Sequence, residues 1–352
     1  MLTAVDLFAG CGGLTLGLKT AGFTILGAVE VDDLAAETYT LNHPEVELWH
    51  QDIRGLTAAA LKRRLGIRKS ELDLLAGCPP CQGFSRLRSL NGRRRVREPQ
   101  NDLVFEFTRF VEELLPRAVM LENVPGLRES YRWRKVLRTL KRLGYEVNSG
   151  VLDAADFGVP QRRRRLIVLA ARDGRVEFAR KARAKKTVAH AIRGLPHPRH
   201  SRDKLHAWPE KRAPHVAELL RHIPKNGGSR RDLPREHRLL CHIRCDGFHD
   251  VYGRMRWGDV APTITSGCVN PSKGRFIHPE HQRCISLREA ALLQSFPPRY
   301  RFSTSRGKFA IAEMIGNALP PEFVRRHAVR IKARLLRQRK ASALGARGQR
   351  SR

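Results

Sequence analysis

Short apolar runs and amphipathic stretches alternate along the first half of the chain. The apolar runs lie at residues 2–8, 24–31, 72–76 and 118–121, and their length is typical of strands buried inside a sheet. Between them, apolar residues recur at helical spacing at residues 14–20, 33–41, 57–65 and 102–115. Because strands that alternate with helices pair in parallel, the pattern predicts an α/β fold with a Rossmann-like, doubly wound, mostly parallel sheet.

The pattern then continues for a further helix and two strands before it breaks. The helix is predicted at residues 132–143, and the strands at 145–153 and 164–171 would extend the same sheet. From residue 172 to about 283 the segments become short, basic and rich in Pro, His and Gly. We therefore expect a second, smaller and irregular domain in this part of the chain.

Regular helical spacing returns at residues 286–294. Ser286 and Glu289 have the spacing of a capping box, and a last helix is predicted near Pro320, since proline suits the first turn of a helix. We predict a main domain at residues 1–171, the irregular domain at 172–283, a return segment of the main domain at 284–336 and a basic, disordered tail at 337–352.

The charge of the chain indicates a polyanionic partner. Lys and Arg outnumber Asp and Glu by 67 to 34, which gives a formal net charge of +33 and an isoelectric point of about 11.1. No apolar run approaches the length of a membrane-spanning helix, so nucleic acid is favoured over a membrane surface. The start of the chain lacks a signal-peptide pattern and the seven cysteines fit a reducing compartment, so we expect a cytoplasmic protein.

A cysteine follows the third predicted strand on a stiff turn. Residues 77–85 read Gly-Cys-Pro-Pro-Cys-Gln-Gly-Phe-Ser, and the two prolines restrict the backbone just before Cys81. Its thiol would therefore be held beyond the carboxyl end of a strand, where open α/β sheets bind ligands. Nucleophilic, redox and metal chemistry all use such a cysteine. Cys78 and Cys81 have no second pair at ligand spacing, and Cys241 and Cys245 fit no common zinc finger, so no metal is predicted.

A glycine-rich turn follows the first predicted strand and opens a helix, as in many nucleotide-binding proteins. Its glycines, at positions 10, 12 and 13, depart from the dinucleotide fingerprint G-x-G-x-x-G. Asp6 could meet a cationic amino acid portion of a ligand, Glu30 a ribose diol and Asp52 an adenine amino group. Together these features favour S-adenosylmethionine, whereas a nicotinamide oxidoreductase is the alternative that the fold alone would allow.

These segments occur in the order found in one enzyme family. They are residues 6–13, Glu30, 51–53, 77–85, 122–124, 160–165, 288–294 and 316–318. In these motifs the chain resembles the bacterial DNA (cytosine-5)-methyltransferases over about residues 1–172 and 286–324. The resemblance implies a class I methyltransferase fold, S-adenosyl-L-methionine as methyl donor and double-stranded DNA as substrate. It also implies that residues 172–283 form the target-recognition domain.

The resemblance implies roles for four catalytic residues. Carbon 5 of cytosine is a poor nucleophile, and attack by the Cys81 thiolate on carbon 6 makes it enamine-like. Glu122 would hydrogen-bond to or protonate ring nitrogen 3, while Asn123 would fix the loop. Arg163 and Arg165 would alternate on one strand, share a face and hold the carbonyl of the flipped base and a nearby phosphate.

Further positions are implied for the methyl donor and for DNA. Besides Asp6, Glu30 and Asp52, the cofactor site would include Phe8, Gly10, Gly12, Gly13, Ile53 and Asn317, with residues 316–318 completing the methionine-side wall. A base inside a duplex is unreachable, so the target cytosine must flip out of the stack. DNA contacts would come from Ser85, Arg86 and Arg88 in the active-site loop, and from Arg254, Arg256, Thr263 and Thr265 in the irregular domain.

The biological setting follows from the same resemblance. We expect a monomer at the bacterial nucleoid that acts as the modification partner of a restriction endonuclease or as an orphan relative. Methylation of tRNA cytosine by the same chemistry is an alternative, but the long segment 172–283 favours a duplex DNA site. A non-catalytic DNA-binding relative is the other alternative, and the presence of Cys81, Glu122 and Arg165 argues against it.

Overall fold

The chain folds into two compact units. The computed structural model describes residues 1–80, 102–210, 212–244 and 249–350. The first unit comprises Met1–Asp153, Arg164–Lys181 and Leu319–Arg352, and the second comprises Ala154–Arg163 and Ala182–Ala318. These packing boundaries differ from the predicted ones, because residues 284–318 pack within the second unit and only the chain from Leu319 returns to the first.

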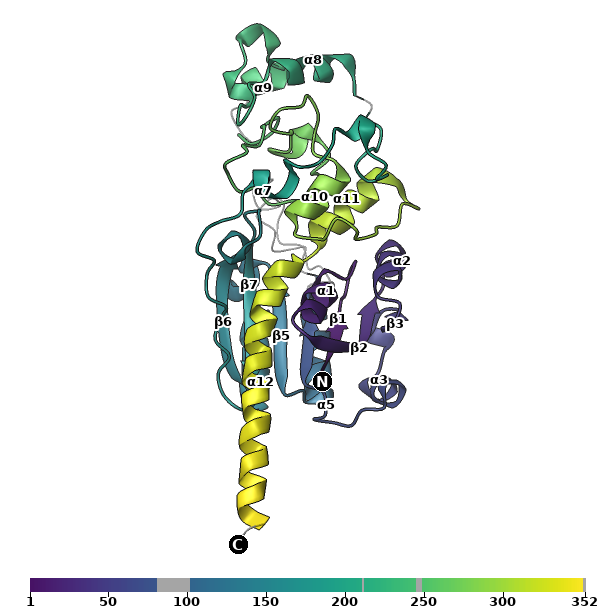
Figure 1. Cartoon of the computed structure of the whole chain (residues 1–352), viewed down its shortest axis with the longest axis vertical. Coiled ribbons are helices and arrows are strands. Elements are labelled where there is room, and N and C mark those ends of the chain that lie inside the picture. Colours follow the sequence, from purple (N-terminus) through teal and green to yellow (C-terminus); the bar gives the residue numbers. More distant parts are fainter. Residues whose placement is uncertain (81–101, 211, 245–248, 351–352) are drawn as a thin grey trace. The chain divides into compact units, whose positions relative to one another are not determined.

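A seven-stranded sheet forms the centre of the first unit (Figure 1). Its order is β3 (Glu47–His50), β2 (Phe23–Glu30), β1 (Leu2–Leu7), β4 (Leu74–Gly77), β5 (Ala118–Asn123), β7 (Arg164–Ala171) and β6 (Glu146–Asp153). The first five strands are parallel, and β7 is antiparallel to both of its neighbours. The predicted α/β fold with a mostly parallel sheet is therefore confirmed.

Helices cover the sheet at the positions that the apolar spacing predicts. They are α1 (Gly13–Thr20), α2 (Asp33–Asn42), α3 (Ala58–Leu65), α5 (Leu103–Leu114), α6 (Tyr131–Arg142) and α12 (Pro321–Arg350). Phe107 and Phe110 of α5, Leu61 of α3 and Leu140 of α6 are buried in one core with residues of β1, β4, β5 and β7. Side-chain caps begin α2, α3 and α6, where Asp32, Thr57 and Ser130 accept hydrogen bonds from backbone N–H groups. No helix within the described ranges is long and apolar enough to cross a membrane.

Helix α12 begins where proline predicts and includes most of the segment that the sequence suggested as a disordered tail. The helix continues to Arg350 and extends past the end of the sheet in Figure 1. Its apolar residues Val324, Ala328, Ile331 and Leu335 are buried at helical spacing. Once this part is anchored, the Arg, Lys, Gln, Ala and Leu residues of the tail, which are strong helix formers, can prolong the helix residue by residue.

The second unit consists of short helices joined by loops. Its α-helices are α7 (Val188–Ile192), α8 (Pro214–His222), α9 (Leu240–Arg244), α10 (Leu287–Leu293) and α11 (Gly307–Asn317). Only isolated bridges occur between extended segments in the part of this unit that the structure describes. A small apolar core contains Leu220, Ile223 and Ile277. The predicted capping box of α10 is confirmed, since Ser286 and Glu289 each accept the other's backbone N–H.

Candidate functional site

Three neighbouring parallel strands end at one edge of the sheet. β1 ends at Leu7, β4 at Gly77 and β5 at Asn123, and their pairing places these carboxyl ends side by side. The predicted nucleophile Cys81 comes directly after Pro80 and lies outside the described residues, as do Ser85, Arg86 and Arg88. The structure therefore defines the frame from which the cysteine segment leaves the sheet.

The chain is held tightly where it leaves β4. The N–H of Cys78 donates to Leu7 O at 3.3 Å, and Asn123 Nδ2 donates to Pro79 O at 2.9 Å. A Cβ at Gly77 would lie 2.7 Å from Leu7 O and 2.9 Å from the Phe107 ring, so the strand admits only glycine here. Asn123 thus fixes this turn, as the sequence predicts, and the backbone enters the Cys81 segment from a fixed position.

Glu122 of β5 and Arg165 of β7, both predicted to contact the base, lie next to each other. Glu122 Oε1 lies 2.8 Å from Arg165 Nε, and the two side chains are 11% and 17% exposed. Arg165 Nη1 also donates to the Arg164 carbonyl oxygen at 2.8 Å. Since both side chains are largely withdrawn from water yet keep an exposed portion, they offer a carboxylate and a guanidinium to a small polar ring.

Arg163 lies immediately before β7, which begins at Arg164, and belongs to the second unit. Its side chain is buried, and Nη1 donates to Ile264 O at 3.2 Å and to Gly316 O at 3.0 Å. The guanidinium is committed to backbone carbonyls instead of an open site.

The glycine-rich turn after β1 is organised by Glu30. Glu30 Oε2 accepts the N–H of Gly10 at 2.7 Å, while Oε1 accepts the N–H groups of Val31 and Asp32 at 2.9 Å each. Burial raises the pKa of Glu30. Gly10 has φ +54° with no atom within 4 Å of an added Cβ, so the backbone is bare on that side. A ligand could approach the turn closely there.

Asp6 lies beneath the same turn and is completely buried. Its Oδ2 accepts the Thr15 hydroxyl at 2.7 Å, and the same hydroxyl lies 2.8 Å from Tyr39 Oη. Burial raises the pKa of Asp6 to about 7. Oδ1 has no hydrogen-bond partner among the residues that the structure describes. Because the side chain has no exposed surface, the predicted direct contact of Asp6 with a cationic ligand group is not supported.

Of the remaining predicted cofactor residues, Asp52 follows β3 and the others lie on or beside α1, after β3 and at the end of α11. Glu30 pairs in register with His50 of β3, so Asp52, two residues further on, follows at the same edge. Both Asp52 oxygens contact the Arg54 guanidinium, which with the Arg54 N–H lowers the pKa of Asp52. Phe8 is half-buried with φ 61°, Gly12 and Gly13 lie at the start of α1, Ile53 is buried and Asn317 is exposed at the end of α11.

One predicted DNA contact in the second unit is wrong. Arg254 is only 1% exposed, and its two terminal nitrogens donate to the carbonyl oxygens of His278, His281, Leu220 and Ile223. Burial lowers its pKa to about 10. The residue therefore ties loops together and is not available to DNA. Arg256 is exposed, while Thr263 and Thr265 are partly exposed.

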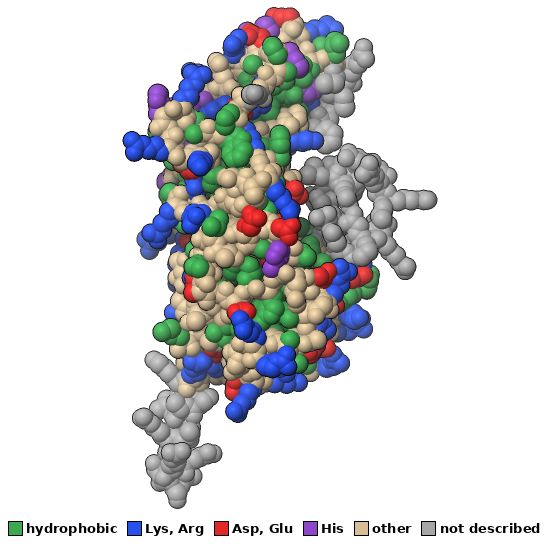
Figure 2. Space-filling model, turned by 90° about the vertical axis from the view of Figure 1, so that its right-hand side faces the viewer, with side chains coloured by type: hydrophobic (Ala, Val, Ile, Leu, Met, Phe, Trp, Pro, Cys, Tyr) green, Lys and Arg blue, Asp and Glu red, His purple; other side chains and the backbone are tan. Residues whose placement is uncertain are grey.

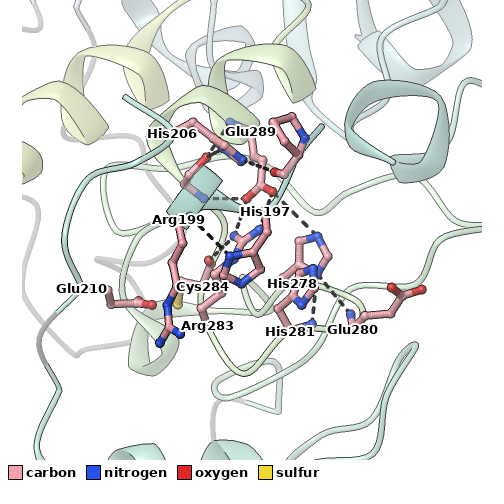
Figure 3. Close-up of polar contacts among 12 residues, drawn as sticks. His197, Arg199, His206, Glu210, His278, Glu280, His281, Arg283, Cys284 and Glu289 are labelled. Carbon is pink, nitrogen blue, oxygen red and sulfur yellow. Dashed lines mark hydrogen bonds and ion pairs between the residues drawn. The ribbon is translucent and has the colours of Figure 1, made fainter. Parts of the chain in front are cut away.

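Glu289 joins three parts of the second unit (Figure 3). Arg283 donates two hydrogen bonds to its carboxylate, at 2.6 and 2.7 Å, and the Ser286 N–H donates a third at 2.7 Å. The Ser286 hydroxyl lies 2.7 Å from His206 Nδ1, whose Nε2 lies 2.8 Å from Pro196 O. His278, beside Glu289, has its pKa lowered to about 3 by burial and is neutral. The sequence indicated the helix cap, but not these partners distant along the chain.

The chain matches the family model C-5 cytosine-specific DNA methylase over residues 2–333. The chain belongs to this family. It is accordingly a DNA (cytosine-5)-methyltransferase, which confirms the predicted family and enzyme class and excludes the oxidoreductase alternative. The ion-paired Glu122 and Arg165 and the buried glycine turn are therefore parts of a methyltransferase.

Individual relatives agree with this assignment. Type II methylase M.HgiDII of Herpetosiphon aurantiacus is 34% identical, with 90% of this chain and 91% of the relative aligned. Type II methyltransferase M1.HphI of Haemophilus parahaemolyticus is 35% identical over 91% and 84%. A solved E. coli prophage structure, designated a DNA modification methyltransferase, superposes with a TM-score of 0.69 at 26% identity, covering 96% of this chain and 100% of its own.

Lys and Arg side chains are spread over the visible face of this methyltransferase, with acidic residues among them (Figure 2). They do not gather into one patch on that face. The net charge of +33 therefore identifies DNA as an attractive partner without showing where it binds.

Proposed function

We propose that this methyltransferase transfers a methyl group from S-adenosyl-L-methionine to carbon 5 of a flipped cytosine in a specific duplex DNA sequence, through a covalent Cys81 adduct at carbon 6. The observation that carries the proposal is the Glu122–Arg165 pair on β5 and β7. Glu122 lies on β5, which pairs with β4, whose end leads into Cys81, and Arg165 lies on β7, which pairs with the other edge of β5. A nucleophile and two ring-binding groups thus come from neighbouring strands.

The covalent step makes carbon 5 reactive. The Cys81 thiolate adds to carbon 6, the electron pair of the carbon 5–carbon 6 double bond shifts to form a carbon 4–carbon 5 double bond, and the carbon 4–nitrogen 3 pair moves onto nitrogen 3. Glu122 stabilises that pair by hydrogen bonding to or protonating nitrogen 3. Arg165 holds the ring carbonyl through charge-assisted hydrogen bonds and keeps Glu122 oriented. Carbon 5 then takes the methyl group. Removal of the carbon 5 proton by a base expels the thiolate and restores the double bond.

The residues around the glycine turn fit the proposed methyl donor, which supplies an electrophilic methyl group on a sulfonium. Gly10 leaves the backbone bare for close approach, and Glu30 has lone pairs left for a ribose diol. Asp6, completely buried beneath the turn, would hold the turn through Thr15 and favour the cationic amino group of the methionine portion without touching it. Phe8, Gly12, Gly13, Asp52, Ile53 and Asn317 would complete this site.

On the DNA side, residues of two segments would contact backbone and bases. Arg256, Thr263 and Thr265 of the second unit and Ser85, Arg86 and Arg88 of the cysteine segment are assigned to this contact. Because two of the relatives are named Type II methylases, we assign the protein to the modification half of a restriction system or to an orphan relative of one. It would act as a monomer on the DNA of a bacterial cytoplasm.

The decisive experiment incubates the protein with S-adenosylmethionine carrying a labelled methyl group and with duplex DNA or tRNA, followed by sequencing that detects 5-methylcytosine. We expect label in DNA at one short sequence, none in tRNA, and none with Cys81→Ser. Cys78→Ser is the matched control and should still transfer the methyl group. Label confined to tRNA, or equal labelling by Cys81→Ser, would overturn the proposal.

A second experiment traps the covalent bond. In DNA with 5-fluorocytosine at the target, fluorine replaces the proton that must leave from carbon 5, so the thiolate is not expelled after methyl transfer. We expect a DNA adduct that survives denaturing electrophoresis for the wild type and for Cys78→Ser. No adduct is expected for Cys81→Ser.

A further inference from the structure

Three buried polar side chains of the second unit take no part in the chemistry proposed above. Gln161, Arg163 and Gln294 are at most 3% exposed. Gln161 Nε2 donates to Gln294 Oε1 at 2.7 Å and to Leu293 O at 3.3 Å. Long polar side chains are costly to bury unless their hydrogen bonds are made, so a network of this kind fixes whatever it binds.

The network binds one backbone segment from both sides. Gln161 Oε1 accepts the N–H of Ile264 at 2.7 Å, and Arg163 Nη1 donates to Ile264 O at 3.2 Å. The peptide groups on either side of Ile264 are thereby held. Thr263 and Thr265, the proposed phosphate contacts, are the neighbours of this residue, so their positions depend on Gln161 and Arg163.

The same network binds a second segment, at the end of α11. Arg163 donates to Gly316 O at 3.0 Å and to Asn317 O at 3.4 Å. Gln294 Nε2 donates to Ile315 O at 2.7 Å and to Ala318 O at 3.4 Å. Arg163 and Gln294 together therefore hold the four consecutive carbonyl groups of residues 315–318. This segment includes Asn317, the residue proposed to contact the methyl donor.

The two segments also touch each other directly. A Cβ at Gly316 would lie 2.4 Å from the carbonyl carbon of Thr265 and 2.5 Å from the N atom of Ser266. Backbone packs on backbone here without room for a methyl group. A displacement of residues 263–266 should therefore displace residues 315–318, because the two segments are in close backbone contact and share hydrogen bonds to the same side chains.

We propose that Gln161, Arg163 and Gln294 are positioning residues that couple DNA binding at residues 263–265 to methyl-donor binding at residues 316–318. Contact of DNA with Thr263 and Thr265 would fix the α11 end in the arrangement that binds the donor, and the donor would in turn favour DNA. The proposal rests on the proposed function, since it assigns DNA to one segment and the donor to the other.

The test measures coupling in place of activity. The Kd of S-adenosylhomocysteine is determined calorimetrically with and without a short duplex that carries the methylated sequence. For the wild type we expect DNA to tighten binding by a factor in the range of about 5 to 150, and the product to tighten DNA binding equally. Arg163→Lys keeps the charge but cannot reach all three carbonyls, so the factor should fall toward one. Arg162→Lys, at an exposed neighbour, should leave the factor unchanged.

A second variant guards against a loss of folding. Gly316→Ala inserts a methyl group between the two segments and should also reduce the coupling factor, with Gly258→Ala, in open space, as control. A merely structural role for the network would weaken both ligands in Arg163→Lys while leaving their ratio of affinities intact, and that result would overturn the proposal. A wild-type factor of one would also overturn it. If the wild type methylates no DNA, the proposed function itself fails, and the two failures are distinguishable.

Discussion

Replacing Glu122 by glutamine removes the charge and the proton of the carboxyl group while keeping its size. In the structure Glu122 Oε1 lies 2.8 Å from Arg165 Nε, and its side chain is 11% exposed. At an effective dielectric constant of about 20, two unit charges at this distance attract by roughly 6 kcal/mol before desolvation is subtracted. Glutamine retains one hydrogen bond to Arg165 but cannot transfer a proton to ring nitrogen 3.

The expected effect lies in the chemical step. Removing one preorganised polar partner of a transition state costs about 3–4 kcal/mol, or about 100- to 1,000-fold in rate. We expect kcat of Glu122→Gln to fall by this factor, with Kd for DNA changed little, because the duplex backbone does not contact the residue. The assay is single-turnover transfer of labelled methyl groups to the DNA target.

The matched control is Glu129→Gln, a change of the same kind at an exposed position in the connection that follows β5. It should leave the rate unaltered. A single-turnover rate of Glu122→Gln within threefold of the wild type would refute the role of this carboxyl group. Equal rate losses in Glu122→Gln and Glu129→Gln would attribute the effect to a general loss of charge.

Four further predictions concern stability and DNA affinity. Burial raises the pKa of Asp6 from its ordinary 3.8 to about 7, so the stability that the protonated carboxyl group contributes is fully present below pH 3.8 and is lost as pH rises through 7. Asparagine has no such loss, so the stability of Asp6→Asn relative to the wild type should rise between pH 5 and pH 8 in thermal unfolding. A difference that does not depend on pH would contradict this. Gly17→Ala would place a Cβ 2.5 Å from a side-chain carbon of α12 and should lower the free energy of unfolding by about 1–3 kcal/mol in denaturant titrations, whereas Gly55→Ala, in open space, should not. Arg254→Met should destabilise the protein by roughly 3 kcal/mol or more because several buried carbonyls lose their donor, and leave the salt dependence of DNA binding unchanged. Arg256→Ala should weaken DNA binding and reduce the slope of log Kd against log salt by about one. A reduced slope in Arg254→Met, with an unchanged slope in Arg256→Ala, would contradict both statements.

The sheet of the first unit could be predicted because its central strands are buried on both faces. Such strands read as continuous apolar runs, and β1, β4 and β5 match the predicted runs closely. β3 lacks this signal, since Glu47–His50 is short, mixed in polarity and only partly buried. The insertion of antiparallel β7 between β5 and β6 rests on pairing between distant segments, which no local pattern reveals.

The candidate site also contains residues that could be predicted from the sequence and residues that could not. Glu122 and Arg165 could each be assigned to the site in advance, because each belongs to a motif of a recognised family at a strand that the apolar pattern located, whereas their ion pair is seen only in the structure. Arg163 and Arg254 could not be assigned, because a basic stretch looks alike whether its side chains face solvent or the interior. Their carbonyl partners lie 24 to 154 residues away in the sequence, so only the fold shows that they are buried.

The buried arginines also change how the composition is understood. The second unit has short helices and no extended sheet among its described residues, so many backbone carbonyls lack a partner from regular secondary structure. Arginine side chains supply the missing donors, with five N–H groups each. Arg163, Arg238, Arg254, Arg275 and Arg288 all donate to backbone carbonyl oxygens within this unit. Part of the net charge of +33 therefore stabilises the irregular unit, and the number of phosphate contacts must be smaller than the charge suggests.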